Sequence, residues 1–245
     1  MVDILKKTYP ITASDTDNHR FCKMSSLLGY LQNMATDHAI IMQVDSDRLI
    51  EKYGAAWIVA RIYVKLNRPI MFKDELEIHT WHRGAVKSAV VFRDFDLFVN
   101  DTHVGEAVVS WILVDLQNKK ILKPLSYPEI VDSPVPEKIK DIVPAKVKMP
   151  ESLTQEMVRK LYYSDIDVNG HVNNAKYVDI ACDAIQYDKY TNQFISELEI
   201  NYLAECFPDE EIILMRGEQD GIQYVRGADH DSKNRFEVSL KLDSM

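Results

Sequence analysis

The sequence predicts an α+β protein made of two similar halves. A short motif occurs twice, as Ser14-Asp15-Thr16-Asp17 and as Ser164-Asp165-Ile166-Asp167, at an offset of 150 residues (165 minus 15). An amphipathic helical pattern follows each copy, and several strand-like segments separated by turn residues follow each helix. An internal duplication explains this repeated order of elements.

Each half is expected to contain one helix with an apolar stripe. In the first half the stripe comprises Leu27, Leu28, Leu31, Met34, Ala35, His38, Ile41 and Met42, at three- and four-residue spacing. In the second half the stripe is shorter and comprises Val178, Ala181, Cys182 and Ile185. Because an apolar stripe needs a partner surface, each helix is predicted to pack on a sheet.

The strands are predicted from runs rich in Val, Ile and aromatic residues. In each half one such run precedes the helix and four follow it. The runs of the first half are 4–11, 57–67, 75–82, 89–98 and 104–115. The runs of the second half are 158–163, 195–202, 211–218, 222–228 and 236–242. Short connections predict antiparallel neighbours, with one face of each sheet covering the helix.

A proline-rich stretch separates the two halves. Six of the nine prolines fall between Pro124 and Pro150, and proline lacks the backbone donor that helices and sheets use. We therefore expect an N-terminal domain at residues 1–130, an extended linker with several lysines at 131–149, and a C-terminal domain at 150–245.

Charge and cysteine content exclude several classes of protein. The formal net charge of −9 argues against nucleic acid or an anionic membrane as partner. Three cysteines without a close-spaced pair indicate reduced thiols, and no signal peptide or membrane span is apparent, so a cytoplasmic protein is expected. No Gly-rich phosphate loop occurs, and His79 and His82 fall on opposite faces of a predicted strand. Neither a cofactor nor a metal is therefore expected.

The segment before the second helix carries the strongest chemical signal. An Asp, three Asn, a Gly and a His lie between positions 167 and 174, which is more than helix capping requires. The N-terminus of a helix offers backbone N–H groups to a developing oxyanion. Gly170, Val172 and Asn173 are the residues predicted to provide this oxyanion site.

The same segment contains groups that can move protons. His171 can exchange a proton near neutral pH. Asp167 and Asn169 can orient its imidazole or hold a water molecule. A carbonyl-polarising site, a proton carrier and orienting groups together indicate acyl transfer or hydrolysis.

The run Asp167-x-Asn-x-His-Val-Asn-Asn-x-x-Tyr177 resembles the active-site motif of acyl-ACP thioesterases. Its Asp-to-Asn174 part alone also resembles single-domain hot-dog acyl-CoA thioesterases. A second signature of the acyl-ACP family is similar to the segment 201–206, where Glu205 and Cys206 stand side by side, 35 residues after His171. Trp57-Ile-Val-Ala-Arg61 and Arg93-Asp94-Phe95 resemble N-terminal segments of that family, so the likeness spans nearly the whole chain.

This resemblance implies two tandem hot-dog domains, each a curved antiparallel sheet wrapped around a long central helix. It implies hydrolysis of fatty acyl groups from acyl carrier protein, with release of free fatty acid. Asp167, Asn169 and His171 carry over as catalytic residues, together with Glu205 or Cys206. The first copy lacks the Gly-His-Val-Asn-Asn run after Asp17, so one catalytic centre is expected.

Two mechanisms remain open at this point. In one, His171 activates Cys206 as a nucleophile and an acyl-enzyme forms. In the other, Glu205 and His171 activate a water molecule, and the reactivity of thioesters favours this route. The apolar alternation of Leu198, Ile200 and the following residues predicts that Cys206 faces inward.

Substrate and partner recognition are predicted only in outline. A fatty chain needs an apolar pocket, for which Leu31, Met34, His38 and Trp57 are candidates. Acyl carrier proteins are acidic, so an acidic enzyme needs a local basic surface. The candidates for that surface are Lys119, Lys120, Lys123, Lys138, Lys140, Lys146, Lys148, Arg159 and Lys160.

Three alternatives are weaker. A hot-dog acyl-CoA thioesterase would be favoured by two complete motifs, and only one is present. A dehydratase or hydratase of the same fold fits the motif less well. A non-catalytic acyl-binding protein is disfavoured because His171, Glu205 and Cys206 are all present. Hot-dog domains usually pair, and since a tandem chain pairs internally, both a monomer and a homodimer are compatible with the sequence.

Overall fold

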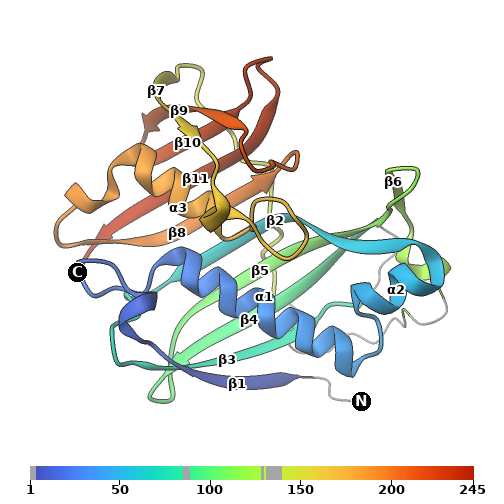
Figure 1. The fold of residues 1–245 in the computed structure, drawn as a ribbon. Coiled ribbons are helices and arrows are strands. Elements are labelled where there is room, and N and C mark those ends of the chain that lie inside the picture. Colours follow the sequence, from blue (N-terminus) through green and yellow to red (C-terminus); the bar gives the residue numbers. More distant parts are fainter. Residues whose placement is uncertain (1–3, 85–88, 128–129, 131–139) are drawn as a thin grey trace.

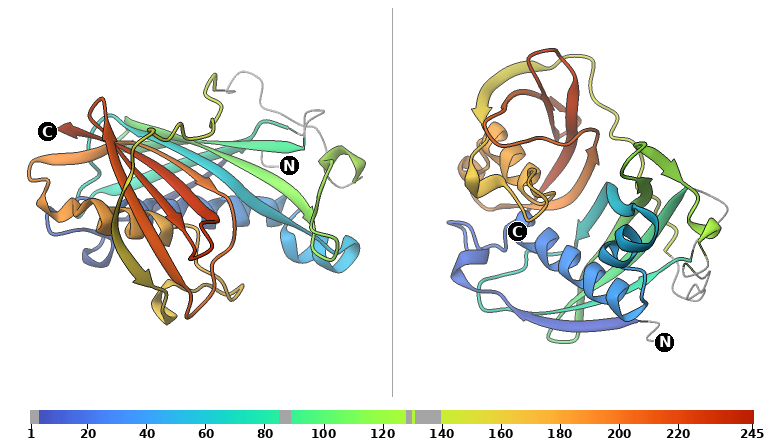
Figure 2. Two further views of the ribbon diagram at one scale, coloured as in Figure 1. Left: turned by 90° about the horizontal axis from the view of Figure 1, so that it is seen from above. Right: turned by 45° about the vertical axis from the view of Figure 1, so that its right-hand side comes forward.

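The chain forms one continuous antiparallel sheet with helices on one side (Figures 1 and 2). The computed structural model describes residues 4–84, 89–127, 130 and 140–245. The strand order is β1-β3-β4-β5-β2-β8-β11-β10-β9-β7, and β6 pairs with β5 at the side of this path. The predicted α+β class is confirmed.

The first half follows the predicted order of elements with two additions. Its elements are β1 (Leu5–Pro10), α1 (Met24–Ile41), α2 (Ser46–Tyr53), β2 (Ala55–Leu66), β3 (Glu75–His82), β4 (Val90–Val99), β5 (Thr102–Asp115) and β6 (Lys120–Leu122). The sequence analysis did not predict α2 or β6. Helix α2 has its own start and stop signals: the Asp45 carboxylate accepts the Arg48 N–H at 3.2 Å, and Gly54 ends the helix at φ +64°.

The second half repeats the first without these additions. Its elements are β7 (Thr154–Lys160), α3 (Lys176–Ile185), β8 (Gln193–Tyr202), β9 (Glu211–Gln219), β10 (Ile222–Ala228) and β11 (Asn234–Ser244). Helix α3 ends where Gln186 takes a left-handed φ of +57°. Among the helices of the described residues, none combines the length and apolarity that a membrane span requires.

The two halves are related by approximate twofold symmetry about the β2–β8 pair. Outward from this pair, β5, β4, β3 and β1 on one side match β11, β10, β9 and β7 on the other. The pair is antiparallel and runs from Arg61 opposite Asn201 to Lys65 opposite Glu197. Helices α1 and α3 contact each other on the same side of the sheet (Figure 2, left). The two hot-dog units implied by the family resemblance therefore share one core.

The part of the linker that the structure describes is bound to the sheet. Residues 140–149 contain no helix or strand, as an extended linker requires. Ile142 accepts a hydrogen bond from Arg83 through its carbonyl at 2.7 Å, and Val147 is buried. Lys140 donates to Asp96 and Glu106 on the sheet face opposite the helices. The remaining linker residues, 131–139, lie outside the described residues.

Candidate active site

The segment with the predicted catalytic residues folds into a tight loop before α3. The Asp167 N–H donates to the His171 carbonyl at 3.0 Å. The Asp167 carboxylate in turn accepts the Asn169 N–H at 2.8 Å. Gly170 takes a φ of +80°, which glycine adopts without strain. This loop places the side chains of Asp167 and His171 next to each other.

His171 lies between two carboxylates. Its Nδ1 is 3.9 Å from Asp167 Oδ1, and its Nε2 is 3.8 Å from Glu205 Oε1. The imidazole is 27% exposed and the Glu205 side chain 47%, so solvent reaches both groups. The Phe207 ring meets the imidazole edge-on, with 6.4 Å between centroids. Both N···O distances exceed a direct hydrogen bond, but a bridging water or a small side-chain rotation would connect the groups.

The Cys206 side chain lies in the core. The residue is fully buried, and its carbonyl accepts the Val172 N–H at 2.9 Å. Burial raises the pKa of its thiol above the ordinary value, although a hydrogen bond from the Tyr177 hydroxyl partly opposes this shift. The inward direction agrees with the strand-parity argument, but β8 ends at Tyr202 and parity does not extend to this loop. The thiol is therefore protonated at neutral pH.

The backbone N–H groups of the predicted oxyanion site are all hydrogen-bonded to carbonyls of the chain. The N–H groups of Gly170, Val172 and Asn173 donate to the carbonyls of Asp167, Cys206 and Asp165, at 3.0, 2.9 and 2.9 Å. Helix α3 begins only at Lys176, so these residues do not form its first turn. The loop uses all three donors to hold its own shape.

In the part of the chain that the structure describes, no hydrogen bond joins Asn169 to the imidazole of His171. The residue is exposed, and its backbone N–H satisfies the Asp167 carboxylate. The predicted orienting role of its side chain stays a prediction.

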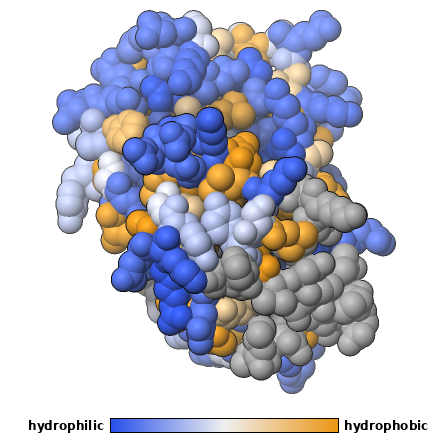
Figure 3. Space-filling model, turned by 90° about the vertical axis from the view of Figure 1, so that its right-hand side faces the viewer, coloured by the Kyte–Doolittle hydropathy of each residue, from blue (hydrophilic) through white to orange (hydrophobic). Residues whose placement is uncertain are grey.

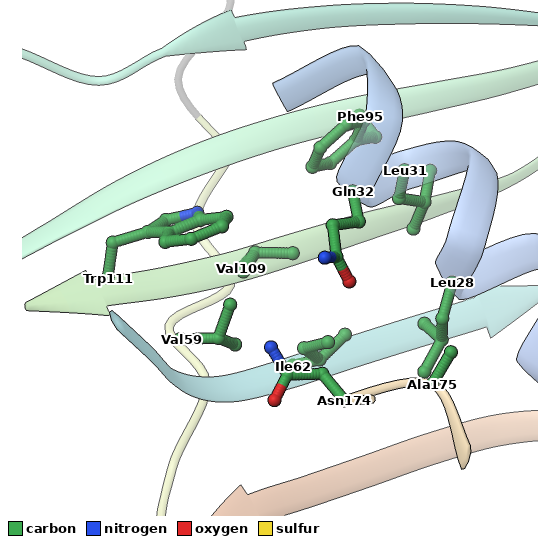
Figure 4. Close-up of a pocket in the computed structure, with 10 residues that line it drawn as sticks. All are labelled: Leu28, Leu31, Gln32, Val59, Ile62, Phe95, Val109, Trp111, Asn174 and Ala175. Carbon is green, nitrogen blue, oxygen red and sulfur yellow. The ribbon is translucent and has the colours of Figure 1, made fainter. Parts of the chain in front are cut away.

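An apolar cavity of about 10 Å³ lies where the two halves meet (Figure 4). Its walls come from α1, β2, β4, β5 and the loop before α3. The lining residues are Leu28, Leu31, Gln32, Val59, Ile62, Phe95, Val109, Trp111, Asn174 and Ala175. The amides of Gln32 and Asn174 approach this space from opposite sides. Within the described residues the buried Trp111 indole N–H has no hydrogen-bond partner. The cavity is as large as one water molecule needs.

Comparison with known proteins identifies the family. Residues 3–131 match the acyl-ACP thioesterase N-terminal domain, and residues 150–242 match the acyl-ACP thioesterase C-terminal domain. The chain belongs to the acyl-ACP thioesterase family. The palmitoyl-acyl carrier protein thioesterase of Cuphea hookeriana is 24% identical over 221 residues, and the dodecanoyl-[acyl-carrier-protein] hydrolase of Cinnamomum camphora is also 24% identical over 221 residues.

Those alignments cover 83% and 84% of this chain but 52% and 57% of the relatives. This member of the family thus spans about half the length of the curated relatives it matches. Two solved structures resemble it over nearly their whole length, each with a TM-score of 0.81. An acyl-ACP thioesterase from Bacteroides thetaiotaomicron is 20% identical, with 98% of both chains covered. The 12:0-ACP thioesterase from Umbellularia californica is 18% identical, with 99% of this chain and 98% of that one covered. At these identities the structures establish the fold.

Of the four acyl-binding candidates in this acyl-ACP thioesterase homologue, only Leu31 lines the cavity. Met34 of α1 is fully buried in the core. His38 Nδ1 lies 2.8 Å from a guanidinium nitrogen of Arg93. Trp57 packs in a separate cluster and donates its indole N–H to the Val44 carbonyl at 2.9 Å. An apolar stripe identifies the buried face of a helix but does not show which part of it borders a cavity.

The sequence analysis missed the polar residues of the cavity wall. Gln32 follows Leu28 by one helical turn, so its amide interrupts the apolar stripe. Asn174 is the last residue of the polar cluster at positions 167–174. Both were visible in the sequence as polar groups at positions predicted to meet the core. Trp111 gave no such signal, because an aromatic residue in a strand is ordinary.

Proposed function

We propose that this chain hydrolyses the thioester of fatty acyl groups on acyl carrier protein and releases free fatty acid. The placement of His171 between Asp167 and Glu205 is the observation that carries this proposal. The same loop extends to Asn174, which lines the apolar cavity. One short segment thus carries a proton-transfer group and part of the wall of an apolar cavity. Relatives named as acyl-carrier-protein hydrolases support the substrate class.

The proposed reaction uses a water molecule as nucleophile. Glu205 takes a proton from this water as its oxygen attacks the thioester carbonyl. The carbon–sulfur bond breaks, and His171 gives a proton to the leaving sulfur, so a fatty acid and a free thiol result. The Asp167 carboxylate stabilises the imidazolium form of His171. The products together contain the atoms of the thioester and one water.

The proposed donor to the carbonyl oxygen is the side-chain amide of Asn174. Its own backbone carbonyl accepts a hydrogen bond from the Tyr202 hydroxyl at 2.8 Å, which fixes the residue at the cavity wall. This assignment replaces the backbone donors predicted from the sequence, all of which are engaged within the loop. An amide donor at this position would stabilise the negative charge that develops during attack.

Direct water attack is favoured over an acyl-enzyme by the different positions of Glu205 and Cys206. Glu205 is half-exposed and approaches His171, whereas Cys206 is buried and faces Tyr177. A nucleophilic cysteine needs a lowered pKa, and burial has the opposite effect here. In this proposal Cys206 contributes to the packing of the core and takes no part in the reaction.

The acyl chain is proposed to bind between α1 and the sheet, along the cavity of Figure 4. At about 10 Å³ this cavity is too small for a fatty chain, so side chains on its wall must move when the chain enters. Leu28 and Leu31 of α1, opposite Val59 and Ile62 of β2, are the side chains proposed to separate. The depth of the opened space would then determine the preferred chain length.

The first experiment is to measure free fatty acid released from acyl-ACPs of 8 to about 18 carbons, chosen to bracket pocket depth, beside the matching acyl-CoAs. Faster hydrolysis of acyl-ACP, abolished in His171→Ala, is the expected result. Preference for acyl-CoA would change the proposed substrate. Absence of hydrolysis with both series would contradict the enzymatic proposal.

A further inference from the structure

A hairpin at one end of β5 combines exposed lysines with exposed apolar side chains. We call the group Leu116, Lys119, Lys120, Ile121, Lys123 and Leu125 the lysine hairpin. Ile121 is 59% exposed and Leu125 45%, and the three lysines are exposed as well. Within the described residues none of these lysines forms an ion pair. The face of the molecule that carries α2 and β6 shows hydrophobic surface among hydrophilic side chains (Figure 3).

Three of the other basic candidates, Lys140, Arg159 and Lys160, are neutralised by carboxylates. Lys140 lies 2.7 Å from Glu106 and also contacts Asp96. Arg159 and Lys160, which are closer to the catalytic loop in sequence, pair with Asp165 at 2.9 Å and Asp209 at 3.0 Å. In a chain with a formal charge of −9, the lysine hairpin is therefore a concentrated positive surface whose lysines form no ion pair with the described residues, although Lys120 interacts electrostatically with Asp115.

The hairpin is connected to the cavity by a single strand. Trp111 of β5 lines the cavity, and Asp115 at the end of the same strand pairs with Lys120 of β6. Four residues of extended strand span about 13 Å. A macromolecule seated on the hairpin would thus stand beside the cavity without covering it. A partner that delivers its acyl group on a flexible arm requires this arrangement.

We propose that the lysine hairpin docks the acidic carrier protein that presents the acyl chain; this inference rests on the proposed function. Opposite charges steer the encounter and orient the two proteins. Ile121 and Leu125 provide the apolar contact at the centre of the interface, and the lysines provide its charged rim. The flexible arm of the carrier then reaches past Trp111 into the cavity.

The decisive variant is Lys119→Glu/Lys120→Glu/Lys123→Glu. For acyl-ACP at low ionic strength we expect kcat/KM to fall about 100-fold, with kcat at saturating substrate changed less than about twofold. The difference from wild type should shrink as salt is added, because salt screens exposed charges. Hydrolysis of acyl-pantetheine, an uncharged substrate that carries the same thioester, should stay at the wild-type rate. Ile121→Ser should lower kcat/KM for acyl-ACP about tenfold without this salt dependence.

A matched control changes three exposed lysines elsewhere, as Lys6→Glu/Lys146→Glu/Lys148→Glu. An equal loss of kcat/KM in this control would overturn the proposal, because the effect would then follow net charge alone or place docking at Lys146 and Lys148, two other candidates from the sequence. Unchanged acyl-ACP kinetics in the hairpin variant would also overturn it. If that variant instead loses binding to vesicles of anionic phospholipid that wild type binds, the hairpin faces a membrane. Failure of wild type to hydrolyse acyl-ACP overturns the proposed function itself, a result distinct from these.

Discussion

The two copies of the repeated loop have the same backbone structure and different side chains. In the first copy the Asp17 N–H donates to the Phe21 carbonyl at 2.9 Å, and in the second the Asp167 N–H donates to the His171 carbonyl at 3.0 Å. Each Asp carboxylate accepts the N–H two residues later, at 2.9 and 2.8 Å. The turn is therefore a property of the Asp and the backbone, independent of the imidazole.

The correspondence continues into the neighbouring segments. Arg20 takes a φ of +68° where Gly170 has +80°. Cys22 donates its N–H to the Ile70 carbonyl at 2.7 Å, as Val172 does to Cys206 at 2.9 Å. Since Ile70 thus corresponds to Cys206, the residue before it, Pro69, corresponds to Glu205. The first copy has Phe and Pro where the second has His and Glu.

The larger of the two pockets borders the first copy of the loop and not the second. The first copy borders a space of about 600 Å³, far larger than the cavity beside the second copy. Its walls include Asp17, Phe21, Asp179 and Asp183, and burial raises the pKa of the Asp183 carboxyl. The larger pocket thus lies at the copy that has Phe21 where the other has His171. Volume alone would have favoured the first copy, whereas the proposed function places catalysis at the second, where His171 and Glu205 replace Phe21 and Pro69.

The largest expected difference between the copies is at Phe21 and His171. His171→Ala should lower kcat for acyl-ACP by 10²- to 10⁴-fold, the usual contribution of acid–base catalysis. Phe21→Leu, at the equivalent position, should change kcat less than about twofold and cost about 1 kcal/mol in unfolding free energy. Steady-state kinetics and urea unfolding of both variants test this pair. A comparable loss of kcat in Phe21→Leu would mean that both copies take part in catalysis.

The next comparison concerns Glu205 and Cys206. Glu205→Gln should lower kcat by roughly 10²-fold, because the amide cannot accept the proton of the attacking water. Cys206→Ala should keep kcat within about threefold, because the thiol is buried and protonated. Rapid-quench mass spectrometry of the wild type should detect no acyl-enzyme. An adduct on Cys206, or a 10²-fold loss in Cys206→Ala, would establish the covalent mechanism instead.

A finer comparison uses the two aspartates, each of which accepts the backbone N–H two residues later in its turn. Both Asp17→Asn and Asp167→Asn should lower the melting temperature, and Asp17→Asn should do so more, because the Asp17 carboxylate accepts the N–H groups of His19 and Phe21 whereas the Asp167 carboxylate accepts that of Asn169. Only Asp167→Asn should slow catalysis, by about tenfold, since it removes the charge that stabilises imidazolium. Circular dichroism melting and kinetics of both variants give the two readouts. Equal activities would show that Asp167 has a structural role alone.

The order of elements was predictable because the duplication repeats every local signal. Periodicity identified β3 and β10 with their observed bounds, and the helix stripes located α1 and α3. The eight-residue helix α2 was missed, although Asp45 and Gly54 mark its ends, because it is too short for a clear periodic signal. The two family signatures identified His171, Asp167 and Glu205 as candidates. They did not reveal which backbone groups of the loop are hydrogen-bonded to one another. The sequence therefore did not show that the N–H groups of the predicted oxyanion donors are already hydrogen-bonded.

The smallest expected effect is on stability at alkaline pH and concerns Cys22, which occupies the position of Val172. Burial, with the nearby charges of Asp15 and Asp17, raises the pKa of the Cys22 thiol from 9.0 to about 12. A thiol that stays protonated in the folded state stabilises the protein fully below pH 9. Above that pH the unfolded thiol loses its proton first, so this contribution falls as pH rises towards 12.

Cys22→Val reproduces the second copy at this position and removes the titrating group. Relative to wild type, the variant should gain about 1 kcal/mol in unfolding free energy between pH 7.5 and pH 10, because only wild type loses the thiol contribution. Urea unfolding of both proteins at the two pH values measures this change, and all other titrating groups cancel in the difference. A difference that does not vary with pH would show that the Cys22 thiol ionises in the folded protein as it does in the unfolded chain. The first copy would then be more open to water at this position than its burial indicates.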